Sequence, residues 1–202
     1  MNKKDILIVC ALKIETQGQL DNYFDDERQI LYTGVGKVNA TLKLTQRLHS
    51  SHLHYTPIMP KLVINYGTAG SRKIKKKTLV DCTKFIQRDM DVTGLGFMRG
   101  ETPFEKEPPL MLENESDFNP IGRNATCGSG DSFVEDRSQY YGEVVDMEAY
   151  ALAKVCRHYG VPFISFKYIT DGADEQAHED WEANLADGIE TFKEKVLNEV
   201  KG

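Results

Sequence analysis

The chain has 202 residues, of which 40% are hydrophobic and 28% are charged, and its net charge is −6. This length and balance predict one globular domain over residues 1–202. The negative charge argues against a nucleic acid or an anionic membrane as partner, and no apolar run reaches membrane-spanning length. The N-terminus lacks the pattern of a signal peptide and the cysteines form no C-x-x-C pair, so we expect a reduced, cytoplasmic protein.

The first half of the chain alternates apolar runs with turns rich in small residues. Its first run is continuously apolar, as in a central strand of a covered sheet, and Glu15 follows the end of that run. The turn Gly34-Val35-Gly36 opens a helix, and glycines there let backbone N–H groups approach a ligand, although a plain strand-to-helix turn explains them as well. Strands are predicted over residues 6–12, 30–33, 61–66 and 78–86, and a helix over about residues 37–48.

The middle of the chain loses its periodicity. From about residue 98 to 129, prolines and acidic residues exclude a continuous helix and predict a long irregular excursion. A tight turn over residues 128–134 follows and carries Phe133. Residues 181–200 have apolar side chains at helical spacing, which predicts one amphipathic closing helix.

Between the excursion and the closing helix lies a predicted strand-helix-strand unit. The run Val144-Val145 is followed by Glu148, residues 149–156 have helical spacing, and the apolar run 162–169 ends at Asp171. Such units build parallel sheets, in which ligands sit at the carboxyl ends of strands. One acid there is equally well explained as a first-turn helix acid, but acids at two successive strand ends favour a functional site.

Several kinds of site are disfavoured. His49, His52 and His54 have no acid or cysteine to complete a metal site, so we expect no metal. No G-x-S-x-G elbow and no G-x-x-x-x-G-K-[ST] loop is present. What remains is a set of three carboxylates after strands with an aromatic side chain, which suits cleavage of a glycosidic bond: one acid protonates the leaving group and another activates water. That set is Glu15, Glu148, Asp171 and Phe133.

Five segments in order carry a resemblance to a known family. The run Val145-Asp146-Met147-Glu148-Ala149, followed by residues 161–163 and 169–174, resembles the signature of the nucleoside phosphorylase and nucleosidase superfamily. Gly67-Thr68-Ala69-Gly70, residues 33–38 and residues 10–15 fit the same pattern. The resemblance extends over nearly the whole chain except residues 98–126, and is greatest to the 5′-methylthioadenosine/S-adenosylhomocysteine nucleosidases.

The resemblance implies a fold and a role for each matching residue. It implies an α/β protein with a three-layer α/β/α sandwich around a mixed sheet. Residues 6–11, 62–66 and 163–169 are expected to be its central strands, because their apolar runs suit burial on both faces. Asp171 would donate a proton to purine N7 and Glu15 would activate the attacking water, without any cofactor. The substrate-binding set would be Glu148 on the ribose hydroxyls, Met147 under the sugar, Phe133 stacked on the base, the Val134 backbone at its edge, Thr68 near the water, Gly70 in the same turn, and Trp181 near the ribose 5′ side.

The nucleophile is the main open choice. Phosphorylases of the superfamily have an Arg before the third-strand turn, where this chain has Asn65-Tyr66, and Glu15 would repel a phosphate dianion. Lys13 and Lys37 remain as cations, so phosphorolysis stays an alternative to hydrolysis. A binding protein without catalysis is the third reading, but such a protein has no need of Glu15.

The expected substrate is a purine nucleoside or a 5′-modified relative. Its 5′ substituent stays open, because the family builds the 5′ pocket partly from segments near the residue 128–134 turn, and the segment before that turn is short, polar and rich in proline here. The resemblance also implies a homodimer. Leu95 and Phe97 are apolar in an otherwise polar loop, so we expect them and the proline-rich excursion to lie near its interface.

Overall fold

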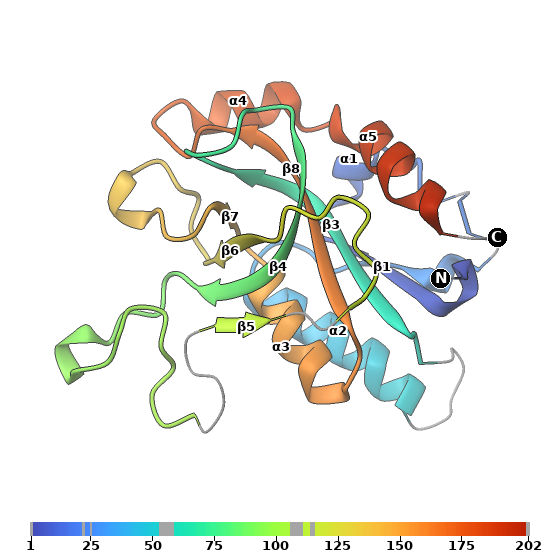
Figure 1. Cartoon of the computed structure of the whole chain (residues 1–202), viewed down its shortest axis with the longest axis horizontal. Coiled ribbons are helices and arrows are strands. Elements are labelled where there is room, and N and C mark those ends of the chain that lie inside the picture. Colours follow the sequence, from blue (N-terminus) through green and yellow to red (C-terminus); the bar gives the residue numbers. More distant parts are fainter. Residues whose placement is uncertain are drawn as a thin grey trace.

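The computed structural model describes residues 2–21, 23–24, 26–52, 59–105, 111–113 and 116–200. A mixed eight-stranded sheet crosses the molecule, with α2 and α3 on one side and α4 and α5 on the other (Figure 1). This confirms the predicted α/β class and the mixed sheet. The strands are β1 Ile6–Cys10, β2 Ile30–Tyr32, β3 Leu62–Gly70, β4 Leu79–Gln87, β5 Met111–Glu113, β6 Ala125–Ser129, β7 Val144–Asp146 and β8 Phe163–Asp171.

The helices cover the two faces of the sheet through two separate hydrophobic cores. Successive residues of β1 alternate between them: Leu7 and Val9 pack with α2 and α3, whereas Ile6, Ile8 and Cys10 pack with α5. Because both faces are covered, β1, β3 and β8 are almost wholly buried and each has neighbours on both sides, as predicted. The helices are α1 Lys13–Thr16, α2 Lys37–His52, α3 Ala149–Tyr159, α4 Ala177–Asn184 and α5 Gly188–Lys195, with 3₁₀ turns at Lys3–Asp5, Glu27–Gln29, Thr93–Leu95, Arg137–Gln139 and Leu197–Glu199.

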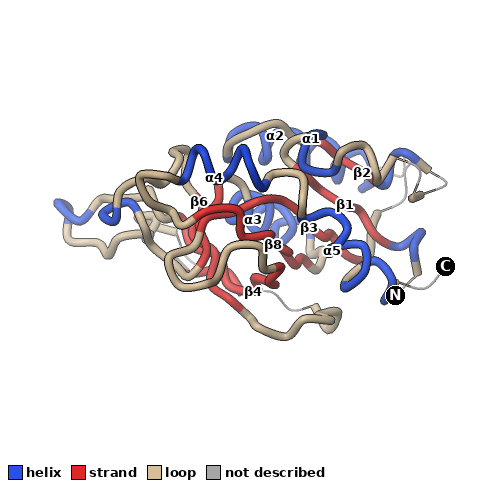
Figure 2. The backbone as a smooth tube through the Cα atoms, turned by 90° about the horizontal axis from the view of Figure 1, so that it is seen from above, coloured by secondary structure: helices blue, strands red, loops and turns tan. Residues whose placement is uncertain are grey.

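The sheet curls until it closes on itself. The strand order is β2-β1-β3-β7-β6-β4-β5, and β8 pairs with both β3 and β4, so that β3, β7, β6, β4 and β8 form a closed circuit. Figure 2 shows these strands grouped in a curved arrangement. The closed part brings the end of β3 against β7, where Gly70 is opposite Val145.

The prediction that β7, α3 and β8 form a parallel unit is wrong. β7 is parallel to β6 but antiparallel to β3, whereas β8 is parallel to β3, so β7 and β8 run in opposite directions. The rule for strand-helix-strand units does not apply here because β7 and β8 are not neighbours: each pairs with β3, on different sides of it. At the end of β3, Gly70 therefore has Asp171 of β8 on one side and β7, which leads to Glu148, on the other.

Two other expectations need correction. The excursion contains β5 and β6, and β6 is a buried strand next to β4. The closing helix is instead divided into α4, α5 and a 3₁₀ turn. At the first residue of α5, Gly188 packs so closely on Tyr168 that a Cβ there would lie 2.4 Å from the Tyr168 side chain. Among the described helices, none is long and apolar enough to cross a membrane.

Candidate active site

A pocket of about 300 Å³ opens where β1, β3 and β8 end and where β7 meets β3. All nine residues predicted for the site line this one pocket. They are Glu15, Thr68, Gly70, Phe133, Val134, Met147, Glu148, Asp171 and Trp181.

Glu15 is held against the end of β3. It lies in α1, directly after β1, and is 4% exposed. Its Oε1 accepts hydrogen bonds from the backbone N–H and the hydroxyl of Thr68, both at 2.9 Å, and its Oε2 accepts one from Leu12 N–H at 3.0 Å. The parallel pairing of β1 with β3 brings these two strand ends together, as their sequence positions predict. Three donors fix one carboxylate where a small nucleophile can reach it.

Asp171 is the last residue of β8 and is 4% exposed. Burial raises the pKa of its carboxyl group, and hydrogen bonds from Ala173 N–H (2.9 Å) and the Thr170 hydroxyl (2.8 Å) offset only part of that rise. A carboxyl group that keeps its proton to a higher pH than usual is suited to act as a general acid near neutral pH. Gly70 makes room for it, because a Cβ at Gly70 would lie 2.4 Å from Asp171 Oδ1.

Glu148 lies just before α3 and is 7% exposed. Its Oε1 accepts a hydrogen bond from Gly36 N–H at 2.8 Å. The N–H group of the glycine-rich turn at the start of α2 therefore binds the Glu148 side chain and not a ligand. Burial, together with the charge of Asp146, raises the pKa of Glu148 to about 8. A carboxyl group in this state can donate as well as accept hydrogen bonds.

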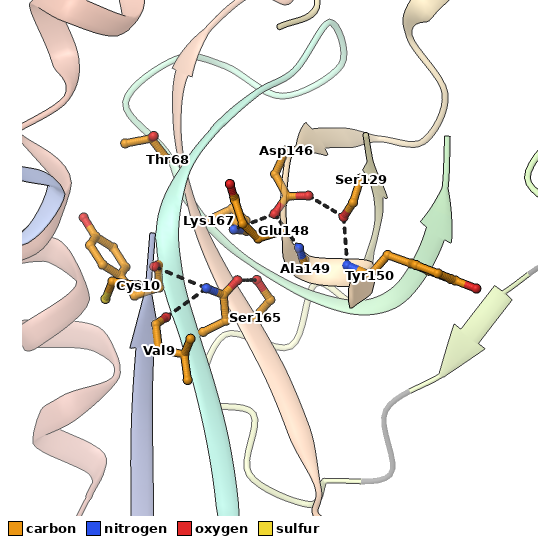
Figure 3. Close-up of polar contacts among 12 residues, drawn as sticks. Val9, Cys10, Thr68, Ser129, Asp146, Glu148, Ala149, Tyr150, Ser165 and Lys167 are labelled. Atoms are coloured by element: carbon orange, nitrogen blue, oxygen red, sulfur yellow. Dashed lines mark hydrogen bonds and ion pairs between the residues drawn. The ribbon is translucent and has the colours of Figure 1, made fainter. Parts of the chain in front are cut away.

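A buried ion pair supports the floor of the pocket (Figure 3). Lys167 Nζ lies 2.8 Å from Asp146 Oδ2, and both side chains are at most 2% exposed. Burial is the largest single influence and opposes both charges, but the neighbouring charges and hydrogen bonds together outweigh it, so the pKa of Lys167 is raised and that of Asp146 is lowered. Asp146 also accepts hydrogen bonds from Ser129 and from Ala149 N–H at 2.9 Å, which anchors the start of α3 and hence Glu148.

Aromatic side chains form the other end of the pocket. Phe133 is 37% exposed and its ring lies 6.5 Å from that of Trp181 and 6.4 Å from that of His178. Trp181 also donates a hydrogen bond from Nε1 to the Thr68 hydroxyl at 3.0 Å. Val134 is buried and Met147 is half-buried beside them. Flat apolar surfaces of this kind suit a heterocyclic base.

The cations of the site are not those that the sequence suggests. Lys13 pairs with Asp21 at 2.5 Å and Lys37 with Asp89 at 2.6 Å, and neither lines the pocket. Arg88 does line it, and its guanidinium donates to the Ser132 hydroxyl at 3.2 Å and to backbone carbonyls of the loop before Phe133.

Sequence reasoning missed Arg88, Lys167 and His178. Lys167 carries the clearest signal, because a lysine within an otherwise apolar strand needs a buried counter-charge. Arg88 follows β4 directly, which is the same kind of position that drew attention to Glu15 and Asp171.

Asn65 is hydrogen-bonded within the sheet and lies outside the pocket lining. Its side chain donates to Val9 O at 2.9 Å and accepts from the Ser165 hydroxyl at 2.7 Å, which ties β3 to β1 and β8. It is 2% exposed and is absent from the pocket lining. The position at which the resemblance implies a phosphate-binding Arg is therefore structural in this chain. No group of three or more His, Cys, Asp or Glu side chains in the described part of the chain is arranged to hold a metal.

Comparisons with known proteins agree with this geometry. The sequence model of the Phosphorylase superfamily matches residues 22–200. The chain belongs to this superfamily. Among curated members, it is 32% identical to the 5′-methylthioadenosine/S-adenosylhomocysteine nucleosidase of Haemophilus ducreyi, over 98% of this chain and 88% of that protein. It is 33% identical to the enzyme of the same name from an Exiguobacterium species, over 74% of this chain and 69% of that protein.

Solved structures of the superfamily share the fold. The futalosine hydrolase of Helicobacter pylori superposes with a TM-score of 0.79 at 24% identity and covers 96% of this chain and 97% of its own. A Helicobacter pylori nucleosidase with 5′-methylthioadenosine in its active site superposes equally well, at 23% identity over 97% of this chain and 99% of its own. These likenesses establish the fold. The matched region of the family model begins after Glu15, whereas the match to the Haemophilus ducreyi protein extends over 98% of this chain.

Proposed function

We propose that this protein hydrolyses the N-glycosidic bond of a purine nucleoside, with 5′-methylthioadenosine and S-adenosylhomocysteine as its expected substrates. The observation that carries the proposal is the buried pair of carboxyl groups in one pocket: Glu15, held by Thr68, and Asp171, whose pKa is raised by burial. The curated relatives named above, which are nucleosidases, support the substrate class.

The chemistry follows from the positions of these groups. Asp171 transfers its proton to the purine as the bond between the base and the sugar C1′ breaks, which leaves an oxocarbenium-like sugar. Glu15 takes a proton from water as the water oxygen bonds to C1′. Glu148 holds the ribose hydroxyls, Met147 packs under the sugar and Phe133 stacks on the base. After this step Asp171 is a carboxylate and Glu15 carries a proton. Glu15 releases that proton to solvent and Asp171 takes one up from solvent, so that the enzyme is restored and the net reaction adds one water across the bond.

Water is favoured over phosphate by the charges around Glu15. A phosphate dianion next to a buried carboxylate needs several cations to offset the repulsion. The guanidinium of Arg88 is bonded to the loop before Phe133, and Lys167 is paired with Asp146. Asn65, where the resemblance implies a phosphate-binding Arg in phosphorylases, is hydrogen-bonded within the sheet.

The test measures free base released from a panel of purine nucleosides, including 5′-methylthioadenosine, with and without phosphate. Hydrolysis is supported if the rate of base release does not depend on phosphate and if Glu15→Gln abolishes that release. The variant should be inactive because a neutral amide cannot take the proton of water. A rate that rises and saturates with phosphate and yields ribose 1-phosphate replaces the proposal with phosphorolysis. Tight binding without base release replaces it with a binding protein.

We also propose a homodimer that works in the cytoplasm. Leu95 is 74% exposed and Phe104 is 91% exposed, on a segment that projects from the body of the molecule (Figure 1). Phe97 packs edge-on against Phe104 with ring centroids 5.5 Å apart. Apolar side chains presented in this way favour a protein contact. The four cysteines are buried and unpaired, which suits a reducing compartment. A monomer by light scattering at micromolar concentration would refute the dimer.

A further inference from the structure

We propose that Trp181 is a positioning residue for the nucleophile: through the Thr68 hydroxyl, its indole N–H holds Glu15 so that only Oε2 is free to accept the proton of water. This inference rests on the proposed hydrolysis and adds to it the residue that orients the base. The contacts that carry it form a chain from α4 through the end of β3 to α1.

The direction of each hydrogen bond in this chain is fixed by chemistry. An indole N–H can donate but cannot accept, so Thr68 Oγ1 is the acceptor of the 3.0 Å bond from Trp181. A hydroxyl has a single hydrogen, and a carboxylate can only accept. The Thr68 hydrogen is therefore committed to Glu15 Oε1 at 2.9 Å and is not available to the attacking water.

The two oxygens of Glu15 are left in different states. Each carboxylate oxygen has two lone pairs. Both lone pairs of Oε1 are used, by the N–H and the hydroxyl of Thr68. Among the described residues, Oε2 accepts one bond, from Leu12 N–H at 3.0 Å. One lone pair of Oε2 thus remains for water, and the attacking water is oriented by a single acceptor.

Loss of the indole N–H removes the constraint on Thr68 without emptying the pocket. The hydroxyl can then turn and offer its hydrogen to the water, which competes with Glu15 for the orientation of the nucleophile. Because Trp181 also faces Phe133 at 6.5 Å, its ring has a second role in lining the pocket, and the test must separate the N–H from the ring. Trp181→Phe does so, since it keeps an aromatic ring and removes the donor.

The first measurement is the bond itself. Trp181 is the single tryptophan of the chain, so a ¹H–¹⁵N spectrum contains one indole N–H resonance. Thr68→Val, which keeps the shape of the side chain and removes the hydroxyl, should move this resonance upfield, and Thr68→Ser should leave it near its wild-type position. A resonance that does not move in Thr68→Val overturns the inference.

The second measurement is a kinetic double-mutant cycle on base release. A neutral hydrogen bond changes an equilibrium constant by about fivefold. Trp181→Phe should therefore lower kcat by roughly fivefold or more with little change in KM. Thr68→Val should lower kcat at least as much, and Thr68→Ser should restore it. In the Thr68→Val background, Trp181→Phe should have no further effect on kcat, because the N–H no longer has a hydroxyl to hold.

The outcomes separate this inference from the proposed function. Additive losses, or a Trp181→Phe enzyme that changes in KM alone, show that the residue only packs against substrate and overturn the positioning role. A wild-type chain that releases no base from any nucleoside overturns the proposed function, and the claim about the nucleophile with it, whatever the resonance of Trp181 does.

Discussion

Gly70 offers the sharpest test of how closely the site is packed. In Gly70→Ala, the new Cβ would lie 2.4 Å from Asp171 Oδ1, whereas real Cβ contacts are essentially never under 3.0 Å. Gly70 does not have a positive φ, so alanine meets no backbone strain there, and its next contact, with the Ala173 Cβ at 3.2 Å, is much less severe. Asp171 must move by at least about 0.6 Å, which is the difference between these two distances.

This displacement sets the expected size of the effect. A misplacement of about 1 Å in a catalytic group can reduce the rate about 10²-fold. The complete loss of a general acid costs about 10²- to 10⁴-fold, which is the upper bound. We expect Gly70→Ala to lower kcat about 10²-fold while a circular dichroism melt shows a folded protein.

Two other glycines provide matched controls. A Cβ at Gly67 would lie 3.3 Å from Glu15 Oε1, so Gly67→Ala requires a shift of only a few tenths of an ångström and should cost less than Gly70→Ala. A Cβ at Gly94 meets no atom within 4 Å, so Gly94→Ala should keep the wild-type rate. A Gly70→Ala enzyme with near-normal kcat, or one faster than Gly67→Ala, would refute the close packing of Asp171 on β3.

Three further predictions concern the buried charges. Asp171→Asn should lower kcat by about 10²- to 10⁴-fold and leave nucleoside binding measurable by calorimetry, and a near-normal rate would exclude it as the acid. Because burial raises the pKa of Glu148 from its ordinary 4.5 to about 8, the folded chain holds a proton that the unfolded chain releases between these values. The stability that this proton contributes is therefore complete at low pH and is lost as the pH rises toward about 8. Glu148→Gln should make Tm fall less steeply with pH over this range, and an unchanged dependence of Tm on pH would contradict the raised pKa of Glu148. Lys167→Met leaves Asp146 charged and unpaired in the core and should destabilise the fold by about 3–5 kcal/mol in urea titrations, whereas a loss below about 1 kcal/mol would mean that the pair is not buried as described.

The sequence predicts those parts of the site that depend on neighbouring strands. Glu15 follows β1 and Thr68 lies near the end of β3. The apolar runs of these strands identify them as central, and their parallel pairing then brings the two side chains to 2.9 Å. The position of Asp171 follows in the same way from β8. These predictions rest on local patterns and on one pairing rule, which is why they succeed without an alignment.

The parts that failed depend on closure of the sheet. The reversed direction of β7 relative to β8 has no local signature, because each strand is apolar whichever way its neighbour runs. The five-residue strand β6 lies in a region whose prolines and acids hide it. The break between α4 and α5 lies where Gly188 contacts Tyr168, a partner twenty residues earlier in the chain. Likewise, the hydrogen bond of Trp181 to Thr68 joins residues 113 positions apart, and no spacing rule indicates it.

The order in which strands leave the ribosome has a consequence for how this protein must be made. β3 pairs with β8, and the side-chain bond that joins them links Asn65 to Ser165, 100 residues later in the chain. Until β8 is synthesised, one edge of an almost wholly buried apolar strand has no partner. An exposed edge of this kind is a template for aggregation, and such long-range pairing folds slowly. We therefore expect fragments that end before residue 163 to be insoluble, and recovery of the full chain from denaturant to fall steeply as protein concentration rises.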